Sequence, residues 1–303
     1  MIKYMVGKSR WTWLLLVLCT ALLCGCSIDS HLKEIPAIKV KDPLATDDEE
    51  DFIGLVLTYF ALPEGESTLV RLPGGKRLLI DTGSAADWPV LYQKLLERKV
   101  TRLDYVVLTN DQPEYAGGYP YLLEKLEIDT LIMPKLIETA IRKGVPVPPG
   151  NKQLAVVEND ELKLDEGVAI QVLMPNEPLF LSPQNNSLVF RLQHDKLRFL
   201  FTSGINEKAE ERLLERHPEQ LKAEVLKVGD QGSNQGSSQP FLTKVDPHVA
   251  IISTGQTLDN LKESQEVLER LGESWAETYI TSQDGTITIL SNGNDYRVLK
   301  EKQ

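Results

Sequence analysis

Cysteine is almost absent from this sequence. There are three, Cys19, Cys24 and Cys26, and all of them lie within the first 26 of 303 residues. The rest of the chain can therefore form no internal disulfide and can offer no thiolate to a metal ion. Its stability has to come from a hydrophobic core.

Histidine is also scarce. The chain has four, which are His31, His194, His217 and His248, and none of them lies in a cluster with metal-motif spacing. We expect each to be an ordinary surface or strand-edge residue. Because zinc sites are built from imidazole, thiolate and carboxylate ligands, we expect no high-affinity zinc site in the chain.

Positive charge is in short supply. The 33 Lys and Arg residues face 44 Asp and Glu residues, for a formal net charge of −11. Residues 1–25 hold three basic and no acidic residues, so the chain without them has 30 against 44, or about −14. This charge opposes attraction to phosphates or to an anionic bilayer. We therefore consider nucleic acid an unlikely partner.

No apolar run is long enough to span a membrane permanently. The stretch from Trp11 to Leu23 has thirteen residues, whereas a spanning helix needs about 20. With three basic residues before it, it has the pattern of a signal peptide. The following Leu23-Cys24-Gly25-Cys26 resembles the bacterial lipobox, whose last cysteine is lipidated and becomes the mature N-terminus. We predict a signal peptide over 1–25, lipidation of Cys26, and anchoring to the extracytoplasmic face of the cell membrane.

The remaining chain divides into a tether and one large domain. Residues 26–51 have no apolar period and end in the acidic run TDDEED, which predicts a solvated linker. Residues 52–303 carry regularly spaced apolar runs and are long enough for one substantial core. Such runs predict strands at 53–60, 66–72, 76–81, 103–108, 129–133, 153–157, 168–173, 187–193, 197–202, 223–228, 248–253 and 286–290. Amphipathic stretches predict helices near 87–98, 116–126, 206–216, 239–245 and 262–272.

This alternation indicates an α/β fold in which helices cover the sheets, although periodicity alone does not separate a four-layer sandwich from one doubly wound sheet. The stretch 69–134 narrows the choice, with Ile80-Asp81-Thr82-Gly83, Leu108-Thr109 and Gly117-Gly118 at the strand ends. It resembles the metallo-β-lactamase-fold domain of ComEC-type competence proteins. Further matches follow at NNSLVFRL (185–192), FLFTSGINEKAEERLL (199–214) and EVLKVGDQGS (224–233). The resemblance covers nearly the whole domain and implies a four-layer αββα sandwich.

The chemistry of that family resides in His and Asp side chains on loops at the strand ends. They hold one or two ions, zinc or manganese, and a bound hydroxide is the usual nucleophile. In the first motif the resemblance places Asn110 and Gln112 at two histidines, Glu114 at the aspartate and Tyr115 at the last histidine. Only Glu114 is a plausible ligand there, because amides and phenols are poor replacements for imidazole.

The second half has lost its ligands in the same way. Gly204 falls at the bridging aspartate, Asp230 and Gln231 fall at paired histidines, and the late histidine falls at about Lys262. The resemblance therefore implies a degenerate metal site, with no catalytic residue, no metal and no other cofactor.

Several of these residues can be interpreted in more than one way. Asp81 is retained from the family motif, where it orients the site, and we favour a carboxylate that braces a tight turn. Asp111, Glu114 and Asp230 could converge on calcium or magnesium, but solvated or capping carboxylates are favoured. Lys262 could place a fixed positive charge beside Asp230 or Glu114.

Three functions compete. The first is a pseudoenzyme whose old cleft binds an extracytoplasmic ligand or protein, or serves only as structure. The second is a hydrolase of the metallo-β-lactamase superfamily, phosphoesterase-like or nuclease-like, with an atypical metal site. The third is an accessory role in DNA uptake, which the net charge opposes. The pattern of lost ligands favours the first.

Overall fold

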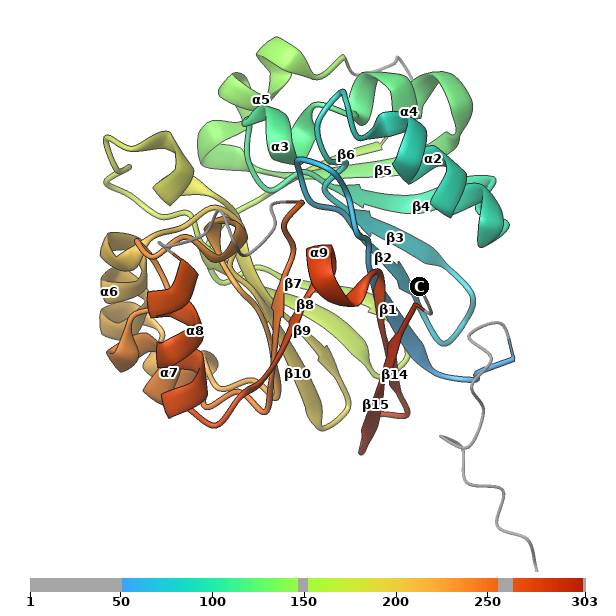
Figure 1. The fold of residues 1–303 in the computed structure, drawn as a ribbon. Helices are drawn as coiled ribbons and strands as arrows, with labels where there is room; N and C mark the ends of the chain where they lie inside the picture. The colour runs from blue at the N-terminus through green and yellow to red at the C-terminus, as the bar shows by residue number, and fades with distance from the viewer. Residues whose placement is uncertain (1–50, 147–151, 256–263, 302–303) are drawn as a thin grey trace, which may run out of the picture. The chain divides into compact units, whose positions relative to one another are not determined.

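A computed structural model describes residues 51–146, 152–255 and 264–301 (Figure 1). All of them belong to one unit, Pro43–Gln303. The predicted lipidation site Cys26, most of the predicted tether and Lys262 lie outside the described residues. Among the residues that are described, no helix is both long and apolar enough to cross a membrane.

The first sheet has eight strands in the order β15-β14-β1-β2-β3-β4-β5-β6. Its parallel part, β3 to β6, runs through the stretch that carries the first family motif. The bounds are β1 Leu55–Tyr59, β2 Thr68–Arg71, β3 Arg77–Ile80, β4 Arg102–Val107, β5 Glu127–Pro134, β6 Lys152–Val156, β14 Ile287–Ser291 and β15 Tyr296–Lys300.

The second sheet has seven strands in the order β13-β12-β11-β10-β9-β8-β7. Strands β10 to β13 pair in parallel, and β7 to β10 are antiparallel. The bounds are β7 Glu161–Asp165, β8 Val168–Met174, β9 Val189–His194, β10 Leu197–Phe201, β11 Val225–Lys227, β12 Val249–Ile252 and β13 Glu277–Ile280.

Helices cover the outer face of each sheet. The helices are α2 Trp88–Glu97, α3 Pro113–Ala116, α4 Tyr119–Lys125, α5 Glu138–Gly144, α6 Glu207–Arg216, α7 Gln239–Val245, α8 Ser264–Glu273 and α9 Thr281–Asp284. Helix α2 shows why its sequence forms a helix at this place. Pro89 lies in the first turn, where no backbone donor is needed. Leu91 and Leu95 are buried one turn apart, on the face toward the sheet. One core cluster joins α2, α4 and α5 to the first sheet, and another joins α6, α7 and α8 to the second.

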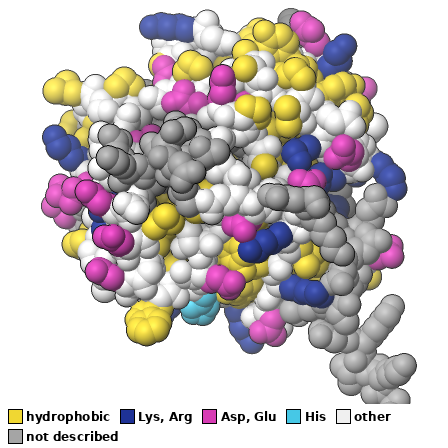
Figure 2. Space-filling view, viewed as in Figure 1, with side chains coloured by type: hydrophobic (Ala, Val, Ile, Leu, Met, Phe, Trp, Pro, Cys, Tyr) yellow, Lys and Arg dark blue, Asp and Glu magenta, His cyan; other side chains and the backbone are white. Residues whose placement is uncertain are grey.

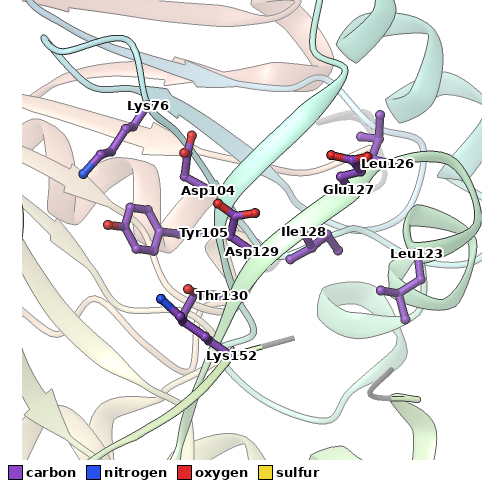
Figure 3. A pocket seen from close by; sticks show the side chains of 10 residues that line it. All are labelled: Lys76, Asp104, Tyr105, Leu123, Leu126, Glu127, Ile128, Asp129, Thr130 and Lys152. Atoms are coloured by element: carbon purple, nitrogen blue, oxygen red, sulfur yellow. The ribbon is translucent and has the colours of Figure 1, made fainter. Parts of the chain in front are cut away.

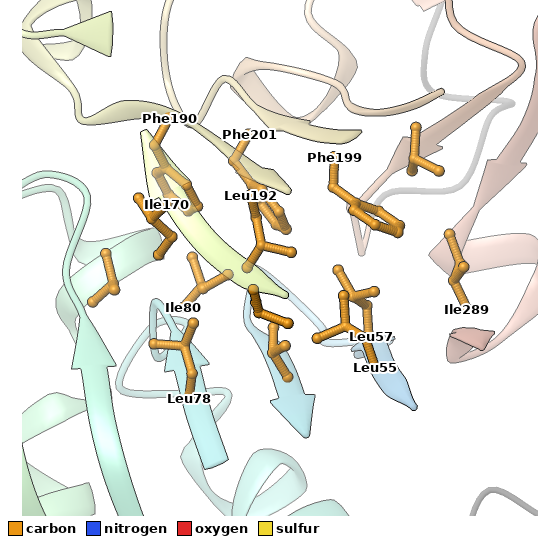
Figure 4. Packing of buried hydrophobic residues seen from close by; sticks show 14 of the residues in the cluster. Leu55, Leu57, Leu78, Ile80, Ile170, Phe190, Leu192, Phe199, Phe201 and Ile289 are labelled. Carbon is orange, nitrogen blue, oxygen red and sulfur yellow. The ribbon is translucent and has the colours of Figure 1, made fainter. Parts of the chain in front are cut away.

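The largest core cluster lies between the two sheets. Leu57, Leu78 and Ile80 of the first sheet meet Phe190 and Phe201 of the second (Figure 4). These residues alternate along their strands with residues that face the helices, as a sheet buried on both sides requires. The layers are therefore helix, sheet, sheet and helix, and the predicted four-layer sandwich is confirmed.

The sequence pattern missed some elements. Strands β7, β13 and β15 were not predicted because they lie at sheet edges and mix polar with apolar residues, so they lack a continuous apolar run. The predicted helix over 116–126 is divided into α3 and α4 at Gly117-Gly118. A Cβ on Gly118 would lie 2.2 Å from the carbonyl oxygen of Thr82, so glycine is needed there for close backbone approach.

Candidate functional site

Four loops meet where the parallel strands of the two sheets end, after β3, β4, β10 and β11. We call them the motif loops. The β3 and β4 loops are joined through Asp81, whose Oδ1 and Oδ2 accept hydrogen bonds from the backbone N–H and the hydroxyl of Thr109, both at 2.8 Å. Asp81 is only 2% exposed, and burial raises its pKa well above the ordinary value. It therefore braces two loops from inside the protein.

Asn110 follows Thr109 and is completely buried. Its Nδ2 donates to Ser187 Oγ at 3.0 Å, and its Oδ1 accepts from the backbone N–H of Gln112 at 2.9 Å. One end of the amide thus fixes the loop against the segment before β9, and the other end braces the loop itself. Gln112 itself precedes the first turn of α3 and is half-buried.

Tyr115 is also completely buried, and its hydroxyl has no hydrogen-bond partner among the described residues. Burial raises the pKa of this hydroxyl well above its usual value, and nearby carboxylates, Glu66 first, raise it further. The phenol is therefore neutral. Glu114, one residue before it, is half-buried.

The β10 loop carries Ser203 and Gly204. Ser203 has a φ of 49° and donates from its hydroxyl to the carbonyl of Leu188 at 2.8 Å. Gly204 is enclosed: a Cβ there would lie 3.3 Å from the hydroxyls of Ser187 and Tyr115 and 3.4 Å from Asn110 Nδ2. The three atoms nearest to a Cβ at Gly204 thus all belong to neutral polar groups.

The β11 loop contains Asp230 and Gln231, both half-buried and both with positive φ, 46° and 52°. The backbone N–H of Asp230 donates to the carbonyl of Ser203 at 2.7 Å, which joins this loop to the β10 loop. Burial raises the pKa of Asp230, and Glu114 adds to the shift by like-charge repulsion. Non-glycine residues in this conformation cost about 1 kcal/mol or more each, so the loops keep a strained shape although their side chains have changed.

Sequence reasoning missed the main buried charge pair at this site. Lys227 ends β11 and Glu66 precedes β2, and they are 3% and 4% exposed. Lys227 Nζ donates to Glu66 Oε2 at 2.5 Å and to the carbonyl of Val228 at 3.0 Å. The pair joins the two sheets across the motif loops. The only sequence signal was that Lys227 stands in EVLKVGDQGS, one of the segments that match the family.

The donor set does not fit a metal ion. Among the residues that the structure describes, no group of three or more His, Cys, Asp or Glu side chains is placed to hold one. Asp111 is exposed, and besides the carboxylates of Asp81, Glu114 and Asp230 the motif loops present amides, a phenol and a glycine. A cavity of about 10 Å³ lies beside Glu66, Asp81, Ser203 and Lys227, which is room for about one water molecule.

Two of the histidines are not surface residues as expected. His194 and His217 are each 5% exposed. His194 Nδ1 is 2.8 Å from Ser291 Oγ, and His217 Nε2 is 2.7 Å from Glu158 Oε1. Both rings are buried because a polar partner is available inside the fold, which the polar local sequence did not indicate. His248 is exposed, and none of the three lies in a motif loop.

A much larger groove lies at the other end of the first sheet. It has a volume of about 820 Å³ and is lined by Asp104 and Tyr105 of β4 and the first four residues of β5, together with Lys76, Lys152 and residues at the end of α4 (Figure 3). Tyr105 and Thr130 point toward the same side as the two lysines, whereas Asp104 and Asp129 point away from them. None of the predicted site residues lines this groove.

The two sheets, their helical layers and the loops at the strand ends define a metallo-β-lactamase fold. The chain belongs to the metallo-beta-lactamase superfamily, whose family model matches residues 64–256. Within it, the domain resembles those of competence proteins. It is 27% identical over 251 residues to ComE operon protein 3 of Bacillus subtilis and 29% identical over 201 residues to competence protein ComA of Neisseria gonorrhoeae.

These alignments cover 74% and 66% of this chain but only 31% and 27% of the relatives, so the chain matches less than a third of their length. Among solved structures, the metallo-beta-lactamase fold protein YhfI from Bacillus subtilis matches with a TM-score of 0.51 at 16% identity, over 75% of this chain and 96% of that one. A putative metal-dependent hydrolase from Parabacteroides distasonis also gives 0.51, at 10% identity, over 76% and 94%. These structures support the fold alone.

Proposed function

We propose that this protein is a non-catalytic member of the superfamily, a pseudoenzyme that binds a ligand or protein partner or serves as structure. The surroundings of Gly204 carry the proposal. Where the family has a bridging carboxylate, this chain has no side chain, and the nearest groups are the neutral Tyr115, Asn110 and Ser187. Neutral hydroxyls and amides are weak ligands for zinc and do not generate a metal hydroxide.

The decisive test is the metal content of the mature domain, purified without a metal-affinity tag. We expect less than stoichiometric zinc, manganese or iron by elemental analysis, and no restoration of hydrolysis of phosphodiester or β-lactam probes when these metals are added. A stoichiometric transition metal in the purified protein would instead support a hydrolase with an atypical metal site.

We also propose that the protein acts outside the cytoplasmic membrane, held by lipid on Cys26. The support is the sequence: a basic n-region, a short apolar run and a lipobox-like Leu23-Cys24-Gly25-Cys26. Mass spectrometry of the native N-terminus is expected to find residues 1–25 removed and Cys26 acylated. An intact leader or an unmodified Cys26 contradicts the anchor, and Cys26→Ala serves as the unlipidated control.

The partner is more plausibly a protein or small ligand than nucleic acid. The relatives named for competence raise an accessory role in DNA uptake, but the excess of acidic residues opposes it. On the face that Figure 2 shows, basic side chains are interspersed with acidic ones and form no continuous basic surface among the described residues. A gel-shift assay with duplex and single-stranded DNA at low salt should detect no binding.

A further inference from the structure

The space around Gly204 is occupied by neighbouring polar side chains. Three polar atoms from three different segments converge on it: Ser187 Oγ and the Tyr115 hydroxyl at 3.3 Å, and Asn110 Nδ2 at 3.4 Å, from the place where a Cβ would stand. These contacts are tighter than ordinary van der Waals separations. Even one added carbon would require the neighbours to move.

Neither Tyr115 nor Asn110 can move aside easily. The carbonyl of Tyr115 accepts hydrogen bonds from the backbone N–H of Thr82 at 2.7 Å and from its hydroxyl at 3.1 Å. Asn110 uses both ends of its amide, toward Gln112 and Ser187. Both side chains are completely buried, so displacing Asn110 would break its hydrogen bonds and displacing the Tyr115 ring would open the core.

The small cavity at the motif loops is lined by neither Gly204, Tyr115 nor Asn110. The cavity between Glu66, Asp81, Ser203 and Lys227 has about 10 Å³. That volume holds about one water molecule. It therefore provides no room into which the side chains around Gly204 could be displaced.

We propose that Asn110 and Tyr115 form a plug in the old metal site, so that this pair and any side chain at position 204 exclude one another. This inference rests on the proposed non-catalytic function and adds a physical reason for it. Metal binding is prevented by packing as well as by the loss of ligands. Single substitutions at position 204 therefore do not bring the site back.

The neutral side chains of Asn110 and Tyr115 are also compatible with the charged groups near them. After burial, the nearby carboxylates Glu66, Asp230, Asp81 and Glu114 raise the pKa of the Tyr115 hydroxyl, and Lys227 is paired with Glu66. A metal-free site with further carboxylates would be destabilised by repulsion between like charges. A neutral phenol and a neutral amide fill the volume without adding negative charge.

The first experiment compares Gly204→Ala with Gly144→Ala by differential scanning calorimetry. A Cβ at Gly144, the last residue of α5, would have no atom within 4 Å. Gly144→Ala is therefore expected to leave the Tm unchanged or raise it slightly, whereas Gly204→Ala should lower it by several degrees. Equal effects at the two glycines would overturn the plug.

The second experiment repeats Gly204→Ala in a Tyr115→Phe background, which keeps the ring and removes the hydroxyl. One of the three close contacts is then absent, so the Tm loss at position 204 should fall by at least a third. An undiminished loss would show that Tyr115 does not occupy the space in question.

The third experiment restores the ligands. Zinc binding is measured in a quadruple variant that carries Asn110→His, Gln112→His, Glu114→Asp and Tyr115→His. The same measurement is made after Gly204→Asp is added to this variant. We expect the added aspartate to tighten zinc binding at least tenfold. Gly204→Asp alone should bind none and be less stable. Metal already present in the wild type would contradict the proposed function, whereas a metal-free wild type in which Gly204→Asp alone captures zinc would contradict only the plug.

Discussion

Asp81 illustrates how one buried carboxyl couples the site to pH. Its two oxygens accept hydrogen bonds from Thr109, while Glu66 raises its pKa and Lys227 lowers it. Burial outweighs these effects and raises the pKa. The folded state therefore binds the Asp81 proton more tightly than the unfolded state. The stabilising contribution is fully present below the unfolded pKa of about 4 and is lost as pH rises through the folded pKa.

Asp81→Asn is expected to remove this pH dependence. The amide has the shape of the protonated acid, accepting from the Thr109 N–H and donating to its hydroxyl, so the loop connection is kept. The free energy of unfolding of the wild type, relative to that of the variant, should fall as the pH rises above the unfolded pKa of about 4. Urea titrations at several pH values measure it. Two parallel curves would show that Asp81 does not titrate in this range.

At the scale of elements, the Lys227–Glu66 pair joins β11 to the segment before β2. Breaking it should be costly because the remaining partner would be a buried, unpaired charge. We expect Lys227→Met to lower the free energy of unfolding by about 3–5 kcal/mol. Lys227→Met combined with Glu66→Gln should recover part of this loss.

The matched control for that substitution is Lys222→Met, which breaks the exposed ion pair of Lys222 with Asp246, at 3.1 Å. These side chains are 54% and 61% exposed, so solvent screens the pair and the change should be within about 0.5 kcal/mol. Chemical denaturation of the variants compares the costs. Similar losses for Lys222→Met and Lys227→Met would contradict a special role for the buried pair.

A second prediction for the elements concerns the junction of α3 and α4. A side chain at Gly118 would collide with the backbone at Thr82, at 2.2 Å, and no flexible group could yield. We expect Gly118→Ala to cost about 1–3 kcal/mol of unfolding free energy. Gly272→Ala in α8, where a Cβ would meet nothing within 4 Å, should be neutral or stabilising. An unchanged free energy of unfolding in Gly118→Ala would mean that the close approach of Gly118 to the backbone at Thr82 is not needed.

At the scale of the whole molecule, folding should not depend on metal. Where a metal is bound only by the folded state, its binding free energy adds to stability and a chelator removes it. We expect the Tm of the mature domain to be the same with and without EDTA. A clear drop in Tm with EDTA would indicate a retained structural ion, and adding back calcium, magnesium or zinc would identify it.

Much of the fold could be predicted from the sequence because the local spacing of apolar residues differs between strands and helices. Stretches rich in apolar residues identified β4, β8, β9 and β10, which lie in the interior of the two sheets. The edge strand β15 was not predicted, because its half-exposed residues show no strong pattern of apolar residues. The predicted partnership of Lys262 with Asp230 or Glu114 stays a prediction, because Lys262 lies outside the described residues.

The sequence by itself determined the absence of cysteine from the body, the scarcity of histidine, the acidic charge and the signal-like start, because each depends only on which residues stand at which positions. Only the tertiary structure decided which side chains meet at the motif loops. Lys227 and Glu66 pair across 161 residues, and Tyr115 and Asn110 pack against Gly204 from the other sheet. Local patterns cannot report such neighbours, because they are created when two separately formed sheets pack face to face.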